Sequence, residues 1–163
     1  QGLISVGHEH YCTGTTQMIM AMLYPRLFRT KRGTRRLVAA CVSGELHELG
    51  LRMLADYSVL KGWDSDFLGA DTPVDGVLRM LEERPAAVLA ISVTMHYHLE
   101  QAEDLIRAVR TSPRIAETII LVGGYSVRIV PSMWQSLGAD GTADDAVAAM
   151  ALAERLLVER EKK

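Results

Sequence analysis

Short apolar runs alternate with longer amphipathic segments from residue 35 onward, and this alternation constrains the fold of the 163-residue chain more than any other feature. The apolar runs have the length and bounding turn residues of β-strands, and the segments between them have helical periodicity. The predicted strands are residues 36–42, 64–68, 87–92 and 118–122, with a short fifth strand at 139–141. The predicted helices are residues 48–61, 74–83, 98–111, 127–137 and 143–160. This order predicts a parallel sheet covered by helices on both faces.

Right-handed helical crossovers restrict the strand orders that such a sheet can take. Five βα units of this length favour an α/β fold of the flavodoxin-like, Rossmann-type kind, with strand order 2-1-3-4-5. In this order the first, third and fourth strands are neighbours. Their carboxyl ends therefore meet at one edge of the sheet, where open α/β sheets bind ligands.

A helical segment precedes the alternating region. Apolar residues recur near helical spacing over residues 3–28, and a polar, basic stretch follows. Because this apolar stripe has no partner in the sequence, we expect it to pack on the following domain, on helices that precede Gln1, or on both. We therefore predict two domains. Residues 1–30 are the carboxyl-terminal part of a helical-bundle cap in a longer protein, and residues 35–163 are the α/β domain.

Composition excludes several classes of function. A net charge of −2 gives no electrostatic footprint for nucleic acid, so we expect this segment to bind none. We recognise no signal peptide and no apolar run of membrane-spanning length, which favours a cytoplasmic protein with no membrane contact. The two cysteines, Cys12 and Cys41, form no disulfide framework and fit a reducing compartment. Cys41 lies in the first predicted strand, where a small buried hydrophobe is expected.

The first predicted strand leads into Gly-Glu-Leu-His-Glu-Leu-Gly, residues 44–50. This sequence places His47 between the carboxylates Glu45 and Glu48 at the ligand-binding edge. A histidine there can offer one ring nitrogen to a metal while a nearby carboxylate holds the other. A solvated loop histidine is the alternative, but the two flanking carboxylates favour the metal-binding interpretation.

Two further signals follow the third and fourth predicted strands: Ser92-x-Thr94 and Gly123-Gly124. Individually, a hydroxyl side chain at a strand end is typical of a helix cap, and a glycine pair of a tight turn. We expect these two motifs and His47 to line a single crevice at one sheet edge. The hydroxyl groups would offer hydrogen bonds to a ligand in this crevice. The glycines, which have no side chains, would let a bulky group approach the backbone.

The three motifs together resemble the cobalamin-binding domain of the base-off/His-on type. That family carries Asp-x-His-x-x-Gly, then Ser-x-Leu or Ser-x-Thr, then Gly-Gly. The corresponding motifs in this chain are Glu45-x-His47-x-x-Gly50, Ser92-x-Thr94 and Gly123-Gly124. The resemblance covers about residues 35–160, including residues 69–73 after the second strand and 138–141 near the end.

The resemblance implies that His47 is the lower cobalt ligand, in place of the dimethylbenzimidazole of the cofactor. The displaced nucleotide tail would lie beside the serine and glycine motifs, and Gly50 would let the next helix start close to it. The cobalamin-binding residues that the resemblance implies in this domain are Glu45, His47, Glu48, Gly50, Thr72, Pro73, Ser92, Thr94, Gly123, Gly124, Tyr125 and Gly141.

The chain departs from the family pattern at Glu45, where mutases and methyltransferases usually carry aspartate. Glutamate is one methylene longer, so the motif alone does not predict a direct hydrogen bond to His47. Gly-Glu-x-His-Glu-Leu-Gly is similar to the variant found in light-responsive cobalamin regulators, the adenosylcobalamin-dependent repressors of carotenoid genes.

Glu9-His10, with Thr13 one turn later, resembles the pair that those regulators place over the upper face of the corrin. On a helix Glu9 and Thr13 share a face, and His10 lies about 100° around from Glu9. The resemblance therefore implies that all three border the ligand, while a solvated first turn is the alternative. The tryptophan that precedes this pair in the relatives would fall before Gln1.

His96 and His98 follow the Ser-x-Thr motif at the start of a predicted helix. We expect partly exposed polar residues there, with a contact to the corrin edge or to a second ligand as the alternative.

The resemblance favours a non-enzymatic sensory module that binds adenosylcobalamin or another alkylcobalamin. Light, or cobalamin itself, would change the contact between the cap and the sheet domain, and with it the state of a homo-oligomer. The alternative is the cobalamin-carrying domain of a methyltransferase or mutase. A receiver-like phosphoacceptor domain of the same fold would need an aspartate where this chain has Ser92. Some light-sensing relatives also hold a linear tetrapyrrole, and nothing in the sequence excludes one.

Overall fold

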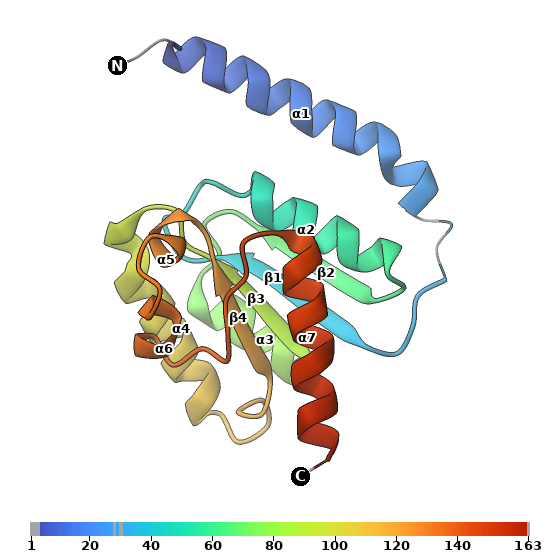
Figure 1. Ribbon diagram of the computed structural model, residues 1–163, viewed down its shortest axis with the longest axis vertical. Coiled ribbons are helices and arrows are strands. Elements are labelled where there is room, and N and C mark those ends of the chain that lie inside the picture. Colours follow the sequence, from blue (N-terminus) through green and yellow to red (C-terminus); the bar gives the residue numbers. More distant parts are fainter. Residues whose placement is uncertain (1–3, 28, 30, 163) are drawn as a thin grey trace. The chain divides into compact units, whose positions relative to one another are not determined.

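The chain divides into two units, residues 1–31 and 32–163, in the computed structural model. The structure describes residues 4–27, 29 and 31–162. In the first unit, helix α1 (Val6–Leu27) forms within the segment predicted to be helical (Figure 1). Within the described ranges, no helix has both the length and the apolar character that a bilayer crossing requires.

The second unit is built on a parallel sheet. Its strands, within the described residues, are β1 (Arg36–Cys41), β2 (Asp64–Gly69), β3 (Val88–Ser92) and β4 (Ile119–Gly123). They lie in the order β2-β1-β3-β4, so β1, β3 and β4 are neighbours as predicted (Figure 1). Cys41 pairs with Ser92 and Ser92 with Gly123, which brings the carboxyl ends of these three strands level with one another.

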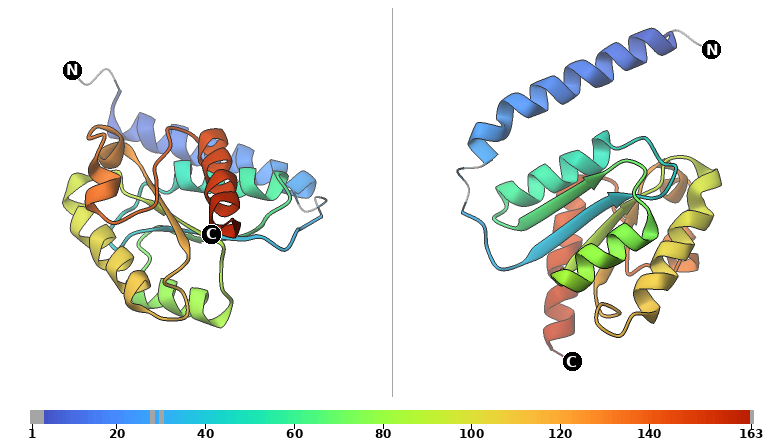
Figure 2. Two further views of the ribbon diagram at one scale, coloured as in Figure 1. Left: turned by 60° about the horizontal axis from the view of Figure 1, so that its bottom comes forward. Right: turned by 180° about the vertical axis from the view of Figure 1, so that it is seen from behind.

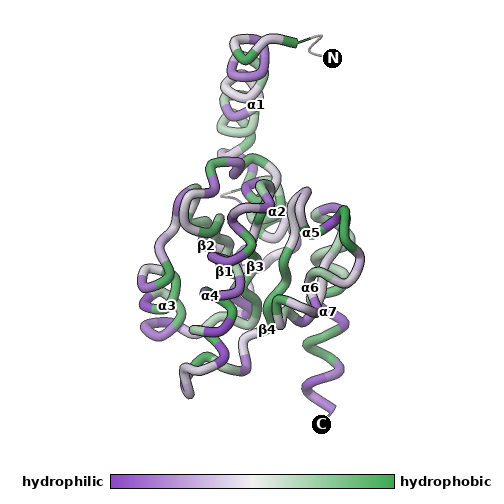
Figure 3. Tube along the Cα trace, turned by 90° about the vertical axis from the view of Figure 1, so that its left-hand side faces the viewer, coloured by the Kyte–Doolittle hydropathy of each residue, from purple (hydrophilic) through white to green (hydrophobic). Residues whose placement is uncertain are grey.

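Helices cover both faces of the sheet (Figure 2). α2 (Leu49–Leu60) and α7 (Ala146–Glu161) pack on one face, and α3 (Val74–Glu83) and α4 (Leu99–Thr111) pack on the other. The strands are therefore apolar on both sides, which is why they read as continuous apolar runs. Figure 3 shows β4 as a hydrophobic segment, whereas the carboxyl end of α7 is hydrophilic.

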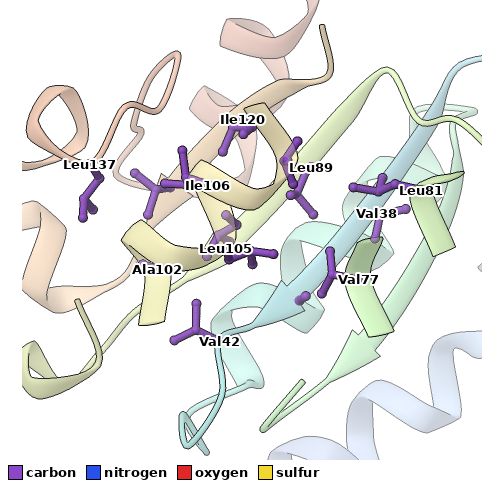
Figure 4. Packing of buried hydrophobic residues seen from close by; sticks show 14 of the residues in the cluster. Val38, Val42, Val77, Leu81, Leu89, Ala102, Leu105, Ile106, Ile120 and Leu137 are labelled. Carbon is purple, nitrogen blue, oxygen red and sulfur yellow. The ribbon is translucent and has the colours of Figure 1, made fainter. Parts of the chain in front are cut away.

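Alternate residues of each strand enter two separate cores, because successive side chains of a strand point to opposite faces. Val38 of β1 belongs to the core under α3 and α4, together with Leu81 and Ile106 (Figure 4). Leu37 and its neighbour on the same face, Ala39, belong to the core under α2 and α7. Both cores position the loops at the carboxyl edge of the sheet.

The predicted fifth strand is wrong: the described residues form four strands. Residues 139–141 make a single parallel bridge, Leu121 with Gly141, and the Val122 amide donates to the Gly141 carbonyl at 3.0 Å. Gly138, at φ +81°, turns the chain immediately before this segment. The segment is therefore too short to extend the ladder beyond one bridge. A β-carbon on Gly141 would lie 2.8 Å from Leu152 Cδ2, so this glycine lets α7 pack against the bridge.

The helix predicted at residues 127–137 is two short helices, α5 (Tyr125–Arg128) and α6 (Met133–Ser136). Pro131 lies between them. Proline lacks an N–H and disfavours a helical conformation at the residue before it, which accounts for the break. A 3₁₀ turn, η1 (His96–His98), precedes α4 and begins two residues before the predicted helix.

Candidate functional site

The side chain of Glu45 is the centre of the carboxyl edge. It is fully buried, and its two oxygens accept hydrogen bonds from two different loops. Oε1 accepts from the His47 backbone amide at 3.0 Å and faces His47 Nδ1 at 2.6 Å. Oε2 accepts from the backbone amides of Thr94 at 2.8 Å and Met95 at 2.9 Å. Glu45 therefore ties the loop after β1 to the loop after β3 and holds His47 directly.

Glu45 is ionised at neutral pH. Burial alone raises its pKa, but the hydrogen bonds from the His47, Met95 and Thr94 backbone amides and from the His47 side chain outweigh burial and lower the pKa from 4.5 to about 2. A carboxylate without a proton can only accept hydrogen bonds. The network therefore assigns the proton of neutral His47 to Nδ1 and leaves a lone pair on Nε2.

His47 presents this second nitrogen outward. Its side chain is 58% exposed although its Nδ1 partner is fully buried. One imidazole nitrogen fixed by a carboxylate and the other open is the arrangement of a metal-binding histidine. Among the described residues no group of three or more His, Cys, Asp or Glu side chains is placed to hold a metal ion. The site thus offers a single histidine nitrogen as a candidate metal ligand.

Beneath His47, the thiol of Cys41 is inert. Cys41 is buried, and its Sγ lies 3.8 Å from the His47 carbonyl oxygen. Burial, followed by the charges of Glu45 and Glu48, raises the pKa of the thiol to about 12. Cys41 is therefore a neutral core residue, as its place in the first predicted strand indicated.

The loop after β2 braces the His47 loop. Asp71 accepts from the Gly44 amide at 2.7 Å through Oδ1, and its own amide donates to the Glu45 carbonyl at 2.9 Å. The Thr72 amide donates to the Cys41 carbonyl at 3.1 Å. Two expected site residues, Thr72 and Pro73, thus lie beside the His47 loop, and Pro73 is the N-cap residue immediately before α3.

Glu48 and Gly50 lie at the start of α2. Glu48 Oε2 accepts from the Ala70 amide at 3.0 Å, which adds a second tie to the loop after β2. A β-carbon on Gly50 would meet nothing within 4 Å. Gly50 therefore leaves open space at the amino end of this helix.

The two glycines after β4 have different roles. A β-carbon on Gly124, at φ +100°, would lie 2.3 Å from the Val93 carbonyl oxygen, so the tight turn itself requires this glycine. A β-carbon on Gly123 would meet nothing within 4 Å. Gly123 is thus the member of the pair that leaves open space at the sheet edge. Tyr125 follows at the start of α5 with its side chain exposed.

Ser92 and Thr94 flank the end of β3. Ser92 is buried at the last position of the strand, between Cys41 and Gly123. The Thr94 amide holds Glu45, and the Thr94 carbonyl accepts from Ser126 Oγ at 2.8 Å. No motif singles out Ser126, whose hydroxyl connects this loop to α5.

His98 contacts Glu45, and no sequence motif predicts this contact. Its Nδ1 lies 3.3 Å from Glu45 Oε2, and its side chain is 13% exposed. His96, two residues earlier, is exposed as expected. The spacing of 53 residues between Glu45 and His98 carries no local signal. Only the adjacency of β1 and β3 indicates that their loops meet.

In the first unit, Glu9 and Thr13 share a face of α1, as predicted. Thr13 Oγ1 donates to Glu9 Oε1 at 2.9 Å. Glu9 Oε2 also lies 3.5 Å from His10 Nε2, and both of these side chains are largely exposed. The three residues thus form a small polar group on α1.

Residues 35–151 match the B12 binding domain family. The chain belongs to this family. Its expected resemblance to cobalamin-binding domains is therefore confirmed. The chain is 31% identical over 140 residues to the HTH-type transcriptional repressor CarA of Myxococcus xanthus, covering 83% of this chain and 46% of the repressor. It is 25% identical over 123 residues to dimethylamine corrinoid protein 3 of Methanosarcina acetivorans, covering 75% of this chain and 56% of that protein.

Solved structures show the same fold for this B12-binding domain. A cobalamin-binding protein from Desulfitobacterium hafniense aligns with a TM-score of 0.69 at 21% identity, covering 75% of this chain and 58% of that one. The Methanosarcina barkeri monomethylamine corrinoid protein aligns with a TM-score of 0.68 at 22% identity, covering 82% and 64%. The domain is therefore a flavodoxin-like α/β fold. The chain spans about half the length of the curated relatives it matches.

Proposed function

We propose that this domain binds cobalamin with His47 as the lower cobalt ligand. The observation that carries the proposal is the 2.6 Å contact of His47 Nδ1 with the buried, ionised Glu45, which leaves Nε2 without a partner from this carboxylate on a side chain that is 58% exposed. Neutral imidazole is the form that binds metals. Glu45 thus orients the ring and raises its basicity before any ligand arrives.

The nucleotide tail of the cofactor would lie beside Ser92 and Gly123. Ser92 and Gly123 are paired at the ends of β3 and β4. A β-carbon placed on Gly123 would have no atom within 4 Å, so the space beside this residue is open. Gly50 has the same open space at the start of α2. We infer that these positions let the tail approach the backbone. Thr94 and Gly124 then serve the site by shaping its loops.

The test of this assignment is the absorption spectrum of bound adenosylcobalamin. Replacing His47 by alanine should convert a histidine-ligated spectrum to the base-off form and weaken binding by more than the roughly 10- to 100-fold that outer partners of a metal ligand contribute. His96→Ala, an exposed histidine of the same edge, is the matched control and should leave the spectrum and affinity unchanged. An unchanged spectrum and affinity in His47→Ala would refute the assignment.

We further propose that the whole protein is a sensory regulator and that light is its signal. Two observations support this reading over that of a carrier domain. The transcriptional repressor shares 31% identity and matches 83% of this chain, whereas the corrinoid protein shares 25% and matches 75%. Glu45 also stands where the mutases and methyltransferases usually carry aspartate. Bound alkylcobalamin supplies a cobalt–carbon bond that visible light breaks.

In this proposal α1 contributes Glu9, His10 and Thr13 to the upper face of the ligand. The Thr13–Glu9 hydrogen bond fixes the carboxylate of Glu9 on the helix, and Glu9 faces His10 in turn. Loss of the upper group of the cofactor would change which cap arrangement is favoured, because a ligand shifts an equilibrium by its differential affinity for the two states.

Illumination of the loaded protein tests the light-sensing proposal. Protein loaded with adenosylcobalamin in the dark should elute from a size-exclusion column as a different oligomer after complete photolysis. The double variant Glu9→Ala, His10→Ala should lose most of that difference while keeping its lower-ligand spectrum. If the unmutated protein elutes identically before and after photolysis, the carrier-domain alternative replaces the sensor. Absorption bands beyond those of the corrin would indicate a linear tetrapyrrole as well.

A further inference from the structure

Asp71, in the loop after β2, has a backbone conformation that residues with a side chain rarely adopt. Its φ is +47°, and among the described residues it is the one residue other than glycine with a positive φ. Aspartate tolerates this left-handed region better than most residues do, but the conformation still costs energy. Asp71 Oδ1 accepts from the Gly44 amide at 2.7 Å, and the Asp71 amide donates to the Glu45 carbonyl at 2.9 Å. The strained residue thus clasps two successive residues of the loop that carries His47.

An irregularity in β2 precedes this clasp. The pairing of β1 with β2 shifts by one residue after Ala39, so that Leu68 is an extra residue of β2. Such a bulge bends its strand and re-aims the residues that follow. Gly69 then turns the chain at φ +87°. The bulge and the turn together carry the chain from the end of β2 to the loop after β1.

The loop that Asp71 clasps has little regular structure of its own. Residues 45–48 belong to neither a helix nor a strand. Two amides of the loop after β3 hold the side chain of Glu45, but these bonds fix its carboxylate and not the backbone from which it extends. Asp71 acts on that backbone, at the Gly44 amide and the Glu45 carbonyl. It therefore fixes the chain at the point where it turns toward His47.

The clasp lies at the surface. Asp71 and Gly44 are both exposed, so water can satisfy the Gly44 amide when the carboxylate is removed. Loss of an exposed hydrogen bond costs little global stability, because no buried group is left without a partner. The backbone of the loop would nevertheless be free to move. The clasp is thus suited to ordering a loop rather than to stabilising the fold.

We propose that Asp71 is a positioning residue for His47. Before any ligand arrives, it holds the loop backbone in the conformation from which the imidazole extends to the ligand-binding edge. A loop ordered in advance loses less conformational freedom on binding, which raises affinity without a new contact. The proposal rests on the proposed function only in naming cobalt as the metal that His47 binds. The order of the loop is a property of the protein without its cofactor.

Three substitutions of Asp71 separate the carboxylate from the strained backbone. Asp71→Asn keeps an acceptor oxygen in a residue that tolerates the left-handed region. Asp71→Gly removes the acceptor and also the strain, whereas Asp71→Ala removes the acceptor and keeps the strain. Asp144→Gly is the matched control, because Asp144 is an exposed aspartate in the bend before α7.

Hydrogen exchange of backbone amides in the cofactor-free protein is the first readout. The His47 amide, which donates to Glu45 Oε1, reports whether the loop is ordered, and the Ile120 amide of the core strand β4 reports global unfolding. We expect Asp71→Gly to speed exchange at His47 about 10-fold, the worth of about one hydrogen bond, and to leave exchange at Ile120 unchanged. Asp71→Asn and Asp144→Gly should leave both rates unchanged. Asp71→Ala should also unfold at a lower urea concentration than Asp71→Gly.

The second readout is the binding of adenosylcobalamin. Asp71→Gly should weaken binding about 10-fold and raise the base-off fraction of the spectrum, in the range measured for outer partners of metal ligands. Asp71→Asn should restore both. Unchanged exchange at His47 and unchanged affinity in Asp71→Gly would overturn the proposal, and so would equal losses in the glycine and asparagine variants. Exchange at His47 that rises only in step with exchange at Ile120 would mark a purely structural role and overturn it as well.

The same series distinguishes failure of this inference from failure of the proposed function. If His47→Ala keeps the unmutated spectrum, His47 is not the cobalt ligand, whereas the exchange rates of the cofactor-free variants still decide what Asp71 does. If His47→Ala loses the histidine-ligated spectrum but Asp71→Gly keeps the unmutated spectrum, affinity and exchange rates, the ligand assignment stands and the role of Asp71 is refuted.

Discussion

The two edges of the sheet both bury charge, but they neutralise it differently. At the amino edge, Arg36 lies 2.5 Å from Asp66 Oδ2, and Asp64 pairs with Arg32 at 2.9 Å and with Arg84. Each of these carboxylates contacts an arginine. At the carboxyl edge, the buried Glu45 is held by backbone amides and imidazoles instead.

This difference separates a structural network from the candidate binding site. The guanidinium of Arg36 is 4% exposed and also donates to the carbonyls of Met80 and Arg84, so its donors are directed at acceptors within the protein. The imidazole of His47 uses one nitrogen on Glu45 and leaves the other facing solvent. A closed set of ion pairs stabilises the fold, whereas the Glu45 network leaves one imidazole nitrogen exposed, as the proposed function requires.

The largest effect is expected at the amino edge. Arg36→Met should lower the free energy of unfolding by about 3–5 kcal/mol, because it removes a buried guanidinium that compensates the partly buried Asp66 and two backbone carbonyls. Urea unfolding followed by circular dichroism measures this change. Arg107→Met, which breaks the exposed pair with Asp104, is the control and should cost less than about 1 kcal/mol.

Cobalamin affinity tests whether the two edges are independent. The fraction of Arg36→Met that remains folded should bind adenosylcobalamin as tightly as the unmutated protein. A loss of affinity larger than the loss of folded protein would show that the amino edge also shapes the site. The two edges would then not be independent.

The next effect separates two glycines within the carboxyl edge. Gly124→Ala should lower the free energy of unfolding by roughly 3–4 kcal/mol, since left-handed strain and backbone overpacking each cost about 1–3 kcal/mol. The 2.3 Å approach to the Val93 carbonyl oxygen is the physical reason. Thermal unfolding of the cofactor-free protein measures it. A stable Gly124→Ala protein with impaired cobalamin binding would return Gly124 to the role of admitting the ligand.

Acid should weaken the Glu45 network within a defined range. The pKa of Glu45 is lowered from 4.5 to about 2 in the folded protein. A depressed pKa contributes stability above the unfolded value, and this contribution is lost as the pH falls from about 4.5 to about 2, up to an amount on the order of 3 kcal/mol. The difference in free energy of unfolding between the unmutated protein and Glu45→Gln isolates it. A difference independent of pH over this range would contradict the assigned charge.

Most of the fold could be predicted because strands buried on both faces are apolar throughout. The start of β1 was predicted to the residue, and that of β3 to within one residue. The prediction of a fifth strand was wrong because residues 139–141 form only one bridge with β4. The number of bridges depends on how the backbone turns at Gly138, and the sequence of a three-residue segment does not show this turn. Pro131 itself is a sequence signal for the break between α5 and α6. The prediction of one continuous helix gave more weight to the helical periodicity on either side of this proline.

The site was predicted at the level of elements but not of contacts. Parallel strand order brings the Glu45, Ser92 and Gly123 segments to one edge, and this follows from topology. Whether Glu45 reaches His47 depends on where the loop backbone places it, because the longer side chain has several conformations. The His98 contact depends in addition on the path of a second loop. Gly123 and Gly124 differ in backbone conformation, since only Gly124 has a positive φ angle. A sequence of two consecutive glycines does not show this difference.

The smallest expected effect is at Gly123, and it tests most directly whether the carboxyl edge is prepared for a ligand. A β-carbon there meets nothing within 4 Å, so Gly123→Ala should change the free energy of unfolding by less than about 1 kcal/mol. If the nucleotide tail occupies this space, affinity for adenosylcobalamin should nevertheless fall about 10-fold, or about 1.4 kcal/mol. Titration followed by the corrin absorption bands measures it. Cobinamide, a corrinoid without the tail, should bind the two proteins equally. A loss shared by both corrinoids would place the clash at the ring, and no loss for either would remove Gly123 from the site.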